Sequence, residues 1–590
     1  MRHTAGTPTL TTGTICQSSQ NLRGYNMRLI PVNTMKISRD NLTEFGGYNH
    51  NLTLQDNQFY DMQNMTTSFY PVLSPRGKRG KIRKIEKPNG LFAKNGLLWV
   101  DKEQLYYNGD LVGQVTDTKK QFVSMGAYVL IFPDKKYFNT DNGEFLDMGA
   151  KFQTVGPTTF HLCKMEGEEY TDYVVSATAP EEPVANQLWL DTSQKPNVLK
   201  QYSETTSSWL AIATTYVKLG ATGIGAAFKQ YDCVTISGCT QEQFNADMVI
   251  WARGDDYIVV AALIDEIFTD ENTITLERRV PDMEYMTESQ NRVWGCSSEK
   301  HEIYACKQGD PTNWFCYMGL DTDSYAVTVG TDGNFTGACT HLGYVLFFKD
   351  GSIHKIYGSK PSNYQLTVVN CRGVQEGSNE SLKVVNETLL YKTRDNICIY
   401  DGSLPISVSN DLGRTFYKDA IAGALEGKYY ISMADAAGTY HLFAYDTISN
   451  FWVKEDNTQA KAFAYWGGEL YYIDQDNYLM CMNGISGTPE EDVEWFAITG
   501  DLGMAHPDKK YISKIQFRMT IEEKTEIRIY VQYDYSGEWE KQMIYHATRK
   551  VTLTLPIIPR RCDTMKIMIA GTGDAKIYNM AKVTEMGSEA

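Results

Sequence analysis

The chain has 590 residues and a mass of 66.7 kDa, which is too large for one ordinary core and predicts several domains. Hydrophobic residues make up 42% and charged residues 22%, values that are typical of folded proteins and argue against a largely disordered chain. The formal net charge of −16 argues against a general nucleic-acid binder or a membrane-surface protein, although an acidic wall would still let DNA slide past.

No apolar run is long enough to span a bilayer, and the N-terminus lacks the apolar core of a signal peptide. The 12 cysteines are scattered singly, without a C-x-x-C pair or zinc spacing. We therefore expect reduced, mostly buried thiols in a protein that folds in a cytosol. The 38 tyrosines favour a β-rich protein, because tyrosine suits strands.

The first part of the chain shows little pattern. Residues 1–34 are rich in Thr, Ser, Gly and Asn without periodicity, and we expect a flexible N-terminal arm there. Patterned sequence begins at residue 35, so residues 35–150 should hold an N-terminal segment followed by the first repeats of a larger series. Pro71 and Pro75 exclude a helix in this lead-in.

A basic cluster follows these prolines and is the strongest one in this acidic chain. It predicts either contact with DNA or an acidic partner, or merely a solvated loop that leads into the first strand. Its six members are Arg76, Lys78, Arg79, Lys81, Arg83 and Lys84.

A repeated strand-turn-strand pattern begins after Gly96. Leu97–Val100 and Gln104–Tyr107 flank one turn, and a second copy begins near Ala127, with 32 residues between Leu98 and Leu130. Apolar, aromatic strands joined by tight Gly and Asn turns are typical of β-hairpins. We expect the first two units of the repeat here.

Residues 151–290 interrupt the repeat and should form an inserted β-rich domain. Pro180 and Pro183 indicate a linker, and residues 180–215 should form a small aromatic module. Its aromatic side chains suit either contact with a glycan or a simple core, and they are Trp189, Tyr202 and Trp209.

The repeat resumes over residues 291–488. Taking Leu346, Leu390, Tyr430 and Tyr471 as equivalent anchors, the steps are 44, 40 and 41 residues. That period, with several short strands in each repeat, predicts a β-propeller of six or seven blades. We expect the two ends of the ring to share one blade.

The last part of the chain, residues 489–590, has evenly spaced strands and predicts a C-terminal β-sandwich. Strict alternation of polar and apolar residues over 526–533 indicates strands with one buried and one wet face. The predicted fold class is therefore all-β: a six- or seven-bladed propeller with an inserted β-rich domain and a C-terminal β-sandwich.

The sequence offers no catalytic constellation. The histidines are isolated and no P-loop, G-x-G-x-x-G, G-x-S-x-G or H-E-x-x-H occurs, so we expect no catalytic residue, no cofactor and no metal. One segment, Ser409-Asn-Asp-Leu-Gly-Arg-Thr-Phe416, resembles the Asp-box of sialidase propellers, which is a hairpin turn. We expect a structural turn, with Ser409, Asp411, Gly413 and Phe416 as its defining residues.

Several segments together resemble propeller proteins of tailed bacteriophages. These are the tail nozzle, or tail tubular protein B, the packaged-DNA stabilisation proteins, and the virion stabilization proteins of phages of gut Firmicutes. The segments are Phe59-Tyr-Asp-Met62 with Asn64-Met65, Tyr70-Pro-Val-Leu-Ser-Pro-Arg76, Gly309-Asp-Pro-Thr-Asn-Trp314, Tyr400-Asp-Gly-Ser-Leu-Pro405 and Leu555-Pro-Ile-Ile-Pro-Arg-Arg-Cys562.

The resemblance implies a non-enzymatic virion protein that is assembled in the bacterial cytoplasm. Six copies would form a ring that extends the DNA channel, retains the packaged genome and passes it during ejection. The implied partners are other copies of the chain, portal or adaptor and other tail proteins, tail fibres, and double-stranded DNA in the lumen. The alternatives are a glycan-binding adhesin at the tail tip and a sialidase-like glycan hydrolase.

Overall fold

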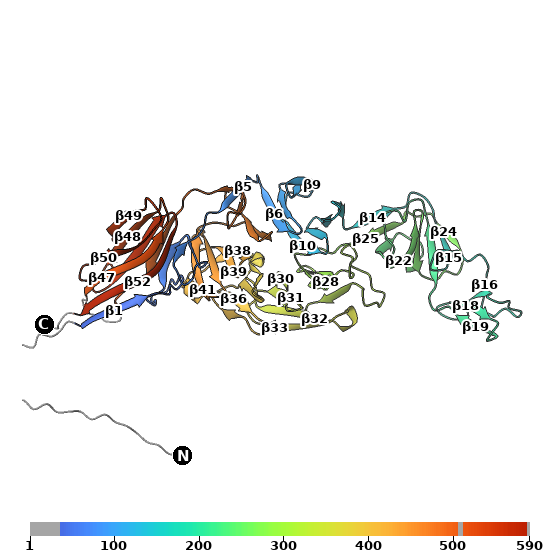
Figure 1. Cartoon of the computed structure of the whole chain (residues 1–590). Helices are drawn as coiled ribbons and strands as arrows, with labels where there is room; N and C mark the ends of the chain where they lie inside the picture. Colours follow the sequence, from blue (N-terminus) through green and yellow to red (C-terminus); the bar gives the residue numbers. More distant parts are fainter. Residues whose placement is uncertain (1–35, 505–510, 587–590) are drawn as a thin grey trace, which may run out of the picture.

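The structure is a computed structural model, and it describes residues 36–504 and 511–586. The arm predicted for residues 1–34 lies outside this part. Apart from four short 3-10 helices, the regular elements in the described part are strands, so the predicted all-β class is confirmed. Figure 1 shows three parts in a row, with a β-sandwich at one end, a propeller in the middle and an inserted domain at the other end. No helix in the two described stretches is long and apolar enough to cross a membrane.

The propeller consists of seven antiparallel blades, six with four strands and the last with a fifth short strand, β45 (Thr488–Pro489), at its edge. Most neighbouring blades pack through their inner strands; the first two meet through Phe92 and Phe122, and the fourth and fifth through β30 and the 3-10 helix η3 (Asn379–Ser381). The last inner strand packs against the first, so the ring is closed. The inner strands are β6 (Pro88–Ala93), β10 (Gln121–Met125), β26 (Tyr285–Ser289), β30 (Phe335–His341), β34 (Lys383–Val385), β38 (Lys418–Leu425) and β42 (Ala462–Trp466).

The second strand of each blade carries the repeat that the sequence shows. The four anchors at 346, 390, 430 and 471 all lie in such strands, which confirms the period. These strands are buried on both faces because each sheet is covered by a neighbour on either side, as in β39, where all seven residues are buried. The second strands are β7 (Leu97–Asp101), β11 (Tyr128–Phe132), β27 (Arg292–Ser297), β31 (Tyr344–Lys349), β35 (Thr388–Lys392), β39 (Lys428–Ala434) and β43 (Glu469–Ile473).

A strand from the N-terminal side closes the ring. The last blade takes three strands from the end of the propeller, and its fourth is β5 (Gly80–Lys84), which pairs with β44 (Tyr478–Cys481). The blade shared by the two ends of the ring is thus as predicted. Gly80 is required at this junction, because a Cβ there would lie 1.8 Å from the Ser486 carbonyl oxygen.

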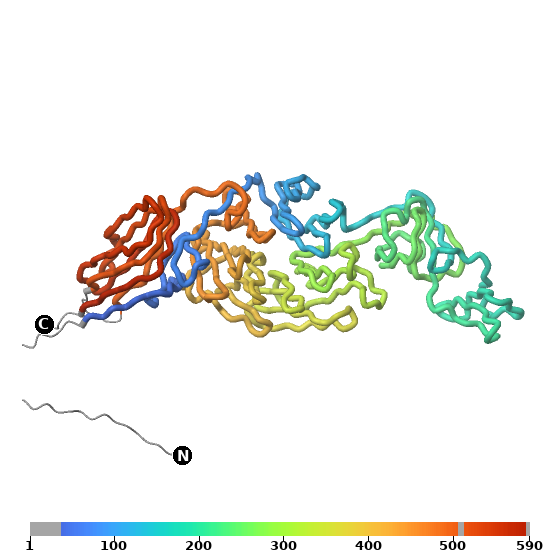
Figure 2. The backbone as a smooth tube through the Cα atoms, in the orientation of Figure 1, coloured from blue at the N-terminus to red at the C-terminus, as the bar shows by residue number. Residues whose placement is uncertain are grey.

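The β-sandwich also draws on both ends of the chain, which the sequence did not predict. Strands β1 (Lys36–Leu42) and β2 (Phe59–Gln63) pair with β52 (Ala575–Met586) and β46 (Glu494–Thr499), rather than leading into the propeller. Figure 2 shows this N-terminal stretch running along the sandwich before it enters the ring. The other sandwich strands are β47 (Tyr511–Ile521), β48 (Glu526–Tyr533), β49 (Glu540–His546), β50 (Val551–Ile557) and β51 (Met565–Thr572).

The sandwich is packed firmly onto the sixth blade. One hydrophobic cluster runs from the sandwich interior, including Trp495, through Tyr48 to Trp452 of β41 (Phe451–Asp456). The Tyr48 amide donates to the Trp452 carbonyl at 2.6 Å, which extends the blade edge toward the sandwich. The two parts therefore share a core instead of meeting through a flexible linker.

The inserted domain leaves the propeller between the second and third blades. Its main sheet has eight strands in the order β14 (Ala150–Gln153), β25 (Thr275–Arg278), β21 (Cys233–Ser237), β22 (Asp247–Gly254), β23 (Tyr257–Ala261), β20 (Tyr216–Gly220), β15 (Thr158–Cys163) and β24 (Phe268–Asp270). Asn313 of the third blade fixes the domain to the ring, since its amide donates to the Tyr231 carbonyl at 2.7 Å. The third blade begins at Tyr285, six residues before the predicted boundary.

The predicted basic cluster is divided by the structure. Arg76 and Arg79 are buried at the joint between sandwich and propeller, where Arg79 bonds Glu455 at 2.7 Å and Asp456 at 2.8 Å. Arg76 bonds Glu490 in the segment that returns to the sandwich. These two guanidinium groups are therefore unavailable to DNA or an acidic partner, because carboxylates already surround them. Lys78 pairs with Asp492 at the surface.

The remaining three cations of the cluster, Lys81, Arg83 and Lys84, are on exposed positions of β5. The ammonium of Lys81 lies 3.5 Å from the centre of the Tyr478 ring, and the Arg83 guanidinium lies 4.9 Å from the Trp99 ring. Contact of these three residues with a partner stays a prediction.

Loss of the Arg79 side chain should destabilise the joint strongly. We expect Arg79→Met to lower the free energy of unfolding by about 3–5 kcal/mol, because it leaves Glu455 and Asp456 buried without their main cation. Arg79 and Arg76 hold the pKa of Asp456 below its usual value despite burial. The native carboxylate thus contributes stability that is lost as pH falls through its folded pKa, so the difference from the variant should shrink below about pH 4.

The control is Lys78→Ala, which removes the adjacent cation from an exposed ion pair with Asp492. This change should alter stability by less than about 0.5 kcal/mol. Urea midpoints and melting temperatures measure both variants. Equal shifts for the two would contradict a structural role for the buried arginine.

Candidate functional site: the axial cavity

All seven blades contribute to a cavity of about 610 Å³ on the propeller axis. It lies at the end of the ring where the inner strands begin, since the connectors between blades deliver the chain to the axis there. Small residues on the inner strands, such as Ala338 and Ala462, leave this space open. Gly90 belongs with these small residues because a Cβ at its position would lie 2.5 Å from the Phe122 ring and would clash with it.

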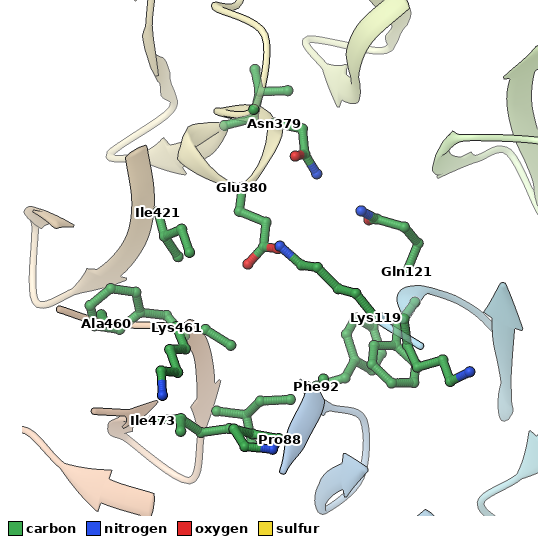
Figure 3. A pocket seen from close by; sticks show the side chains of 18 of the residues that line it. Pro88, Phe92, Lys119, Gln121, Asn379, Glu380, Ile421, Ala460, Lys461 and Ile473 are labelled. Atoms are coloured by element: carbon green, nitrogen blue, oxygen red, sulfur yellow. The ribbon is translucent and has the colours of Figure 1, made fainter. Parts of the chain in front are cut away.

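An ion pair crosses the cavity. Lys119, from the connector before the second blade, lies 2.5 Å from Glu380 in the connector before the fifth blade. Figure 3 shows the two side chains extending toward each other, with the amides of Gln121 and Asn379 to one side. The pair is partly exposed, so its contribution to stability is small, about 0–1 kcal/mol. Its position places a cation and an anion side by side in the middle of the cavity.

The cavity is locally cationic although the protein is acidic. Four lysines line it, against the two carboxylates of Glu380 and Asp419. The charge of Lys120 is balanced by Asp134, whose carboxylate lies 2.5 Å from the ammonium and does not line the cavity. Lys383, at the start of β34, forms no hydrogen bond or ion pair in the described part of the chain. Burial lowers the pKa of this lysine, and the nearby Glu380 opposes the change.

Amide and aromatic side chains complete the wall. The amides of Gln121, Asn379 and Gln459 are half-buried and have no hydrogen-bond partner within residues 36–504 and 511–586. The rings of Phe92 and Phe122 stack at 5.6 Å and present an apolar surface beside them. The cavity thus combines donors, acceptors and flat apolar faces. In the described part of the chain, no group of His, Cys, Asp and Glu could hold a metal ion.

The structure brings the three aromatic residues of the inserted module together. They lie on one face of the sheet formed by β16 (Tyr173–Ser176), β17 (Leu188–Asp191), β18 (Val198–Ser203) and β19 (Ser208–Ala211). Trp209 meets Trp189 and Tyr202 edge to face, each at 5.3 Å. Trp189 is 6% exposed and donates to the Ser176 carbonyl, so it is core rather than a glycan contact. Contact through Tyr202 and Trp209 stays a prediction.

The Asp-box-like segment is a turn, but not a hairpin turn. It contains the 3-10 helix η4 (Asn410–Leu412) and connects the fifth blade to the sixth. Ser409 accepts a hydrogen bond from the Ile397 amide at 2.9 Å, whereas the Asp411 carboxylate makes none in the described part of the chain. Gly413 has φ of 76°, and Phe416 is exposed. The segment is therefore a connector between blades rather than the predicted hairpin turn, and its structural role stays a prediction.

The cavity residues were not found from the sequence. They come from inter-blade connectors and from the first residues of the inner strands, and they share no motif or fixed spacing; Lys119 and Glu380 are 261 residues apart. A usable signal would have been the end of each connector together with the first two positions of the next inner strand, once the blade register was known.

No family model and no curated protein matches the chain. Among the solved structures that match, three cover 50–57% of it. The exo-β-1,3-galactanase of Phanerochaete chrysosporium with galactose has 9% identity and a TM-score of 0.20, covering 50% of this chain and 94% of the enzyme. An engineered GH43 glycoside hydrolase, with endo-xylanase and exo-arabinofuranosidase activity, has 10% identity and a TM-score of 0.20, covering 52% and 98%. Hsv2 of Kluyvelomyces marxianus has 8% identity and a TM-score of 0.25, covering 57% and 93%.

These findings contradict the prediction of a non-enzymatic phage tail ring, because the matched propellers include glycoside hydrolases and none of the three is a phage tail protein. That prediction is not carried further. What the resemblance implies about partners and location stays a prediction. Since the TM-scores are 0.20–0.25, the reactions and substrates of these proteins are not transferred to this chain.

Proposed function

We propose that this protein recognises a saccharide, which it binds in the axial cavity. The observation that carries the proposal is the composition of the cavity wall. Sugar hydroxyls both donate and accept hydrogen bonds, and the amides of Gln121, Asn379 and Gln459 offer both functions without a competing protein partner. The phenyl rings of Phe92 and Phe122 offer an apolar surface to the C–H face of a sugar ring.

The size and charge of the cavity indicate which class of saccharide it would bind. Its volume of about 610 Å³ falls within the range of about 300–1,000 Å³ that is usual for small-ligand sites. Lys383 supplies a cation that no carboxylate in the described residues pairs with, and its desolvation strengthens its attraction for an anion. An acidic sugar, such as a uronic acid, therefore fits better than a neutral one.

Binding is tested by calorimetry with the full chain, using oligogalacturonides alongside neutral xylo- and cello-oligosaccharides. We expect the acidic sugars to bind, and Lys383→Gln to weaken them about 10- to 100-fold, because a charge-assisted hydrogen bond contributes about 1.5–3 kcal/mol. Lys300→Gln is the matched control, since Lys300 is exposed on a turn of the third blade. Lack of binding to every sugar, or equal effects of the two variants, would contradict the proposal.

Hydrolysis of the bound saccharide is a second candidate function. Glu380 and Asp419 line the cavity from two neighbouring blades, and glycoside hydrolysis generally uses two carboxyl groups on either side of the scissile bond. One would protonate the leaving oxygen, and the other would activate water or attack the sugar. Glu380 forms the ion pair with Lys119 in the middle of the cavity, a position that suits the second role.

The release of reducing ends from the sugars that bind distinguishes the two functions. If the protein is a hydrolase, Glu380→Gln and Asp419→Asn should each lower kcat by about 10²–10⁴, with binding retained. Glu299→Gln is the control, since Glu299 is exposed on a turn of the third blade and does not line the cavity. No turnover by the wild type of a saccharide that it binds would exclude hydrolysis and leave recognition.

A further inference from the structure

A second cavity, of about 810 Å³, opens at the same end of the propeller, between the fourth and fifth blades. The connectors before these two blades and the turn between β31 and β32 (Ser352–Tyr357) form its walls. Phe416 stands at its rim with 47% of its surface exposed. No residue of 36–504 or 511–586 fills this space.

Buried polar groups around this cavity lack partners. Thr336 is 4% exposed, and its hydroxyl has no hydrogen-bond partner among the described residues; Gln375 is half-buried, but its side-chain oxygen is buried and likewise has no partner there. Lys349 is 2% exposed, and its ammonium makes one hydrogen bond, to the Thr331 carbonyl at 2.6 Å, with no carboxylate partner in the described residues. Because proteins rarely leave such groups unsatisfied, their convergence on one cavity indicates a ligand that supplies the missing partners.

The two cavities share one wall. The connector before the fifth blade lines the second cavity with Gln375 and Glu376, and it lines the axial cavity with Gly377, Asn379 and Glu380. The boundary between the two cavities lies between Glu376 and Gly377, which are consecutive in the chain. Gly377 has no side chain to raise the wall at this point, and a Cβ there would already lie 3.4 Å from an Asp419 carboxylate oxygen.

We propose that the two cavities are subsites of one extended site, so that the ligand is an oligosaccharide chain rather than a single sugar. This inference rests on the proposed saccharide recognition. One sugar unit occupies the axial cavity, and later units cross the connector at Gly377 into the second cavity. There Lys349 donates to a hydroxyl or carboxylate oxygen, the Gln375 oxygen accepts from a hydroxyl, and the Thr336 hydroxyl does either.

The test compares affinity with chain length, using galacturonic acid and oligogalacturonides of two to six units. Wild-type affinity should rise at least tenfold from the monosaccharide to the longest oligomer. Thr336→Val and Gln375→Leu should each remove about tenfold from the affinity for long oligomers, and change the monosaccharide affinity less than twofold. Thr205→Val is the matched control, because Thr205 is exposed in the inserted module.

The outcomes separate the two proposals. If the wild type binds none of these sugars, the proposed function fails, and this inference fails with it. If it binds monosaccharide and hexamer equally, or if the variants weaken both equally, the extended site is wrong while saccharide recognition stands. If Thr336→Val lowers the melting temperature, its affinities are set aside, and Gln375→Leu, at a half-buried position, decides the length dependence: an unchanged affinity for long oligomers would contradict the extended site.

Discussion

The closure of the ring by β5 is the constraint on which the rest of this structure depends. Without that strand the last blade would have three strands and an open edge of unpaired backbone groups. Each inner strand is held in place by its two neighbours, so a ring that opened at one blade would lose the alignment of all seven. The axial cavity exists only in the closed state, since every blade contributes to its wall.

Burial of Arg76 and Arg79 explains how an N-terminal segment is held at this junction. The two guanidinium groups lie between the strand that closes the ring and acidic residues of the sixth blade and of the segment that returns to the sandwich. Desolvation opposes the burial of so many charges, and mutual pairing offsets it. The positions of these paired charges therefore fix how three chain segments, which are far apart in the sequence, meet at the joint.

The sequence predicts the architecture correctly in the regions where packing makes the pattern of buried residues repeat at a fixed interval. The anchors from Leu346 to Tyr471 lie in doubly covered strands, and their spacing gave the propeller and its approximate blade number. It failed for β1, because Ile37-Ser-Arg-Asp40 is exposed and shows no buried stripe. It also failed for the cavity, whose polar residues lie on connectors and at the starts of inner strands, where the repeat does not constrain the side chain. The family resemblance led to a function that the structural comparisons contradict.

The inserted domain has its two ends side by side, since Ala150 at its start pairs with Arg278 at its end. A ring can carry such a domain without being stretched, because the gap that the chain must span between the second and third blades is the same with or without it. The domain is thus topologically a loop, however large. The size and surface of this domain can therefore diverge, and the whole domain can be replaced by another, at an evolutionary rate that does not depend on the propeller.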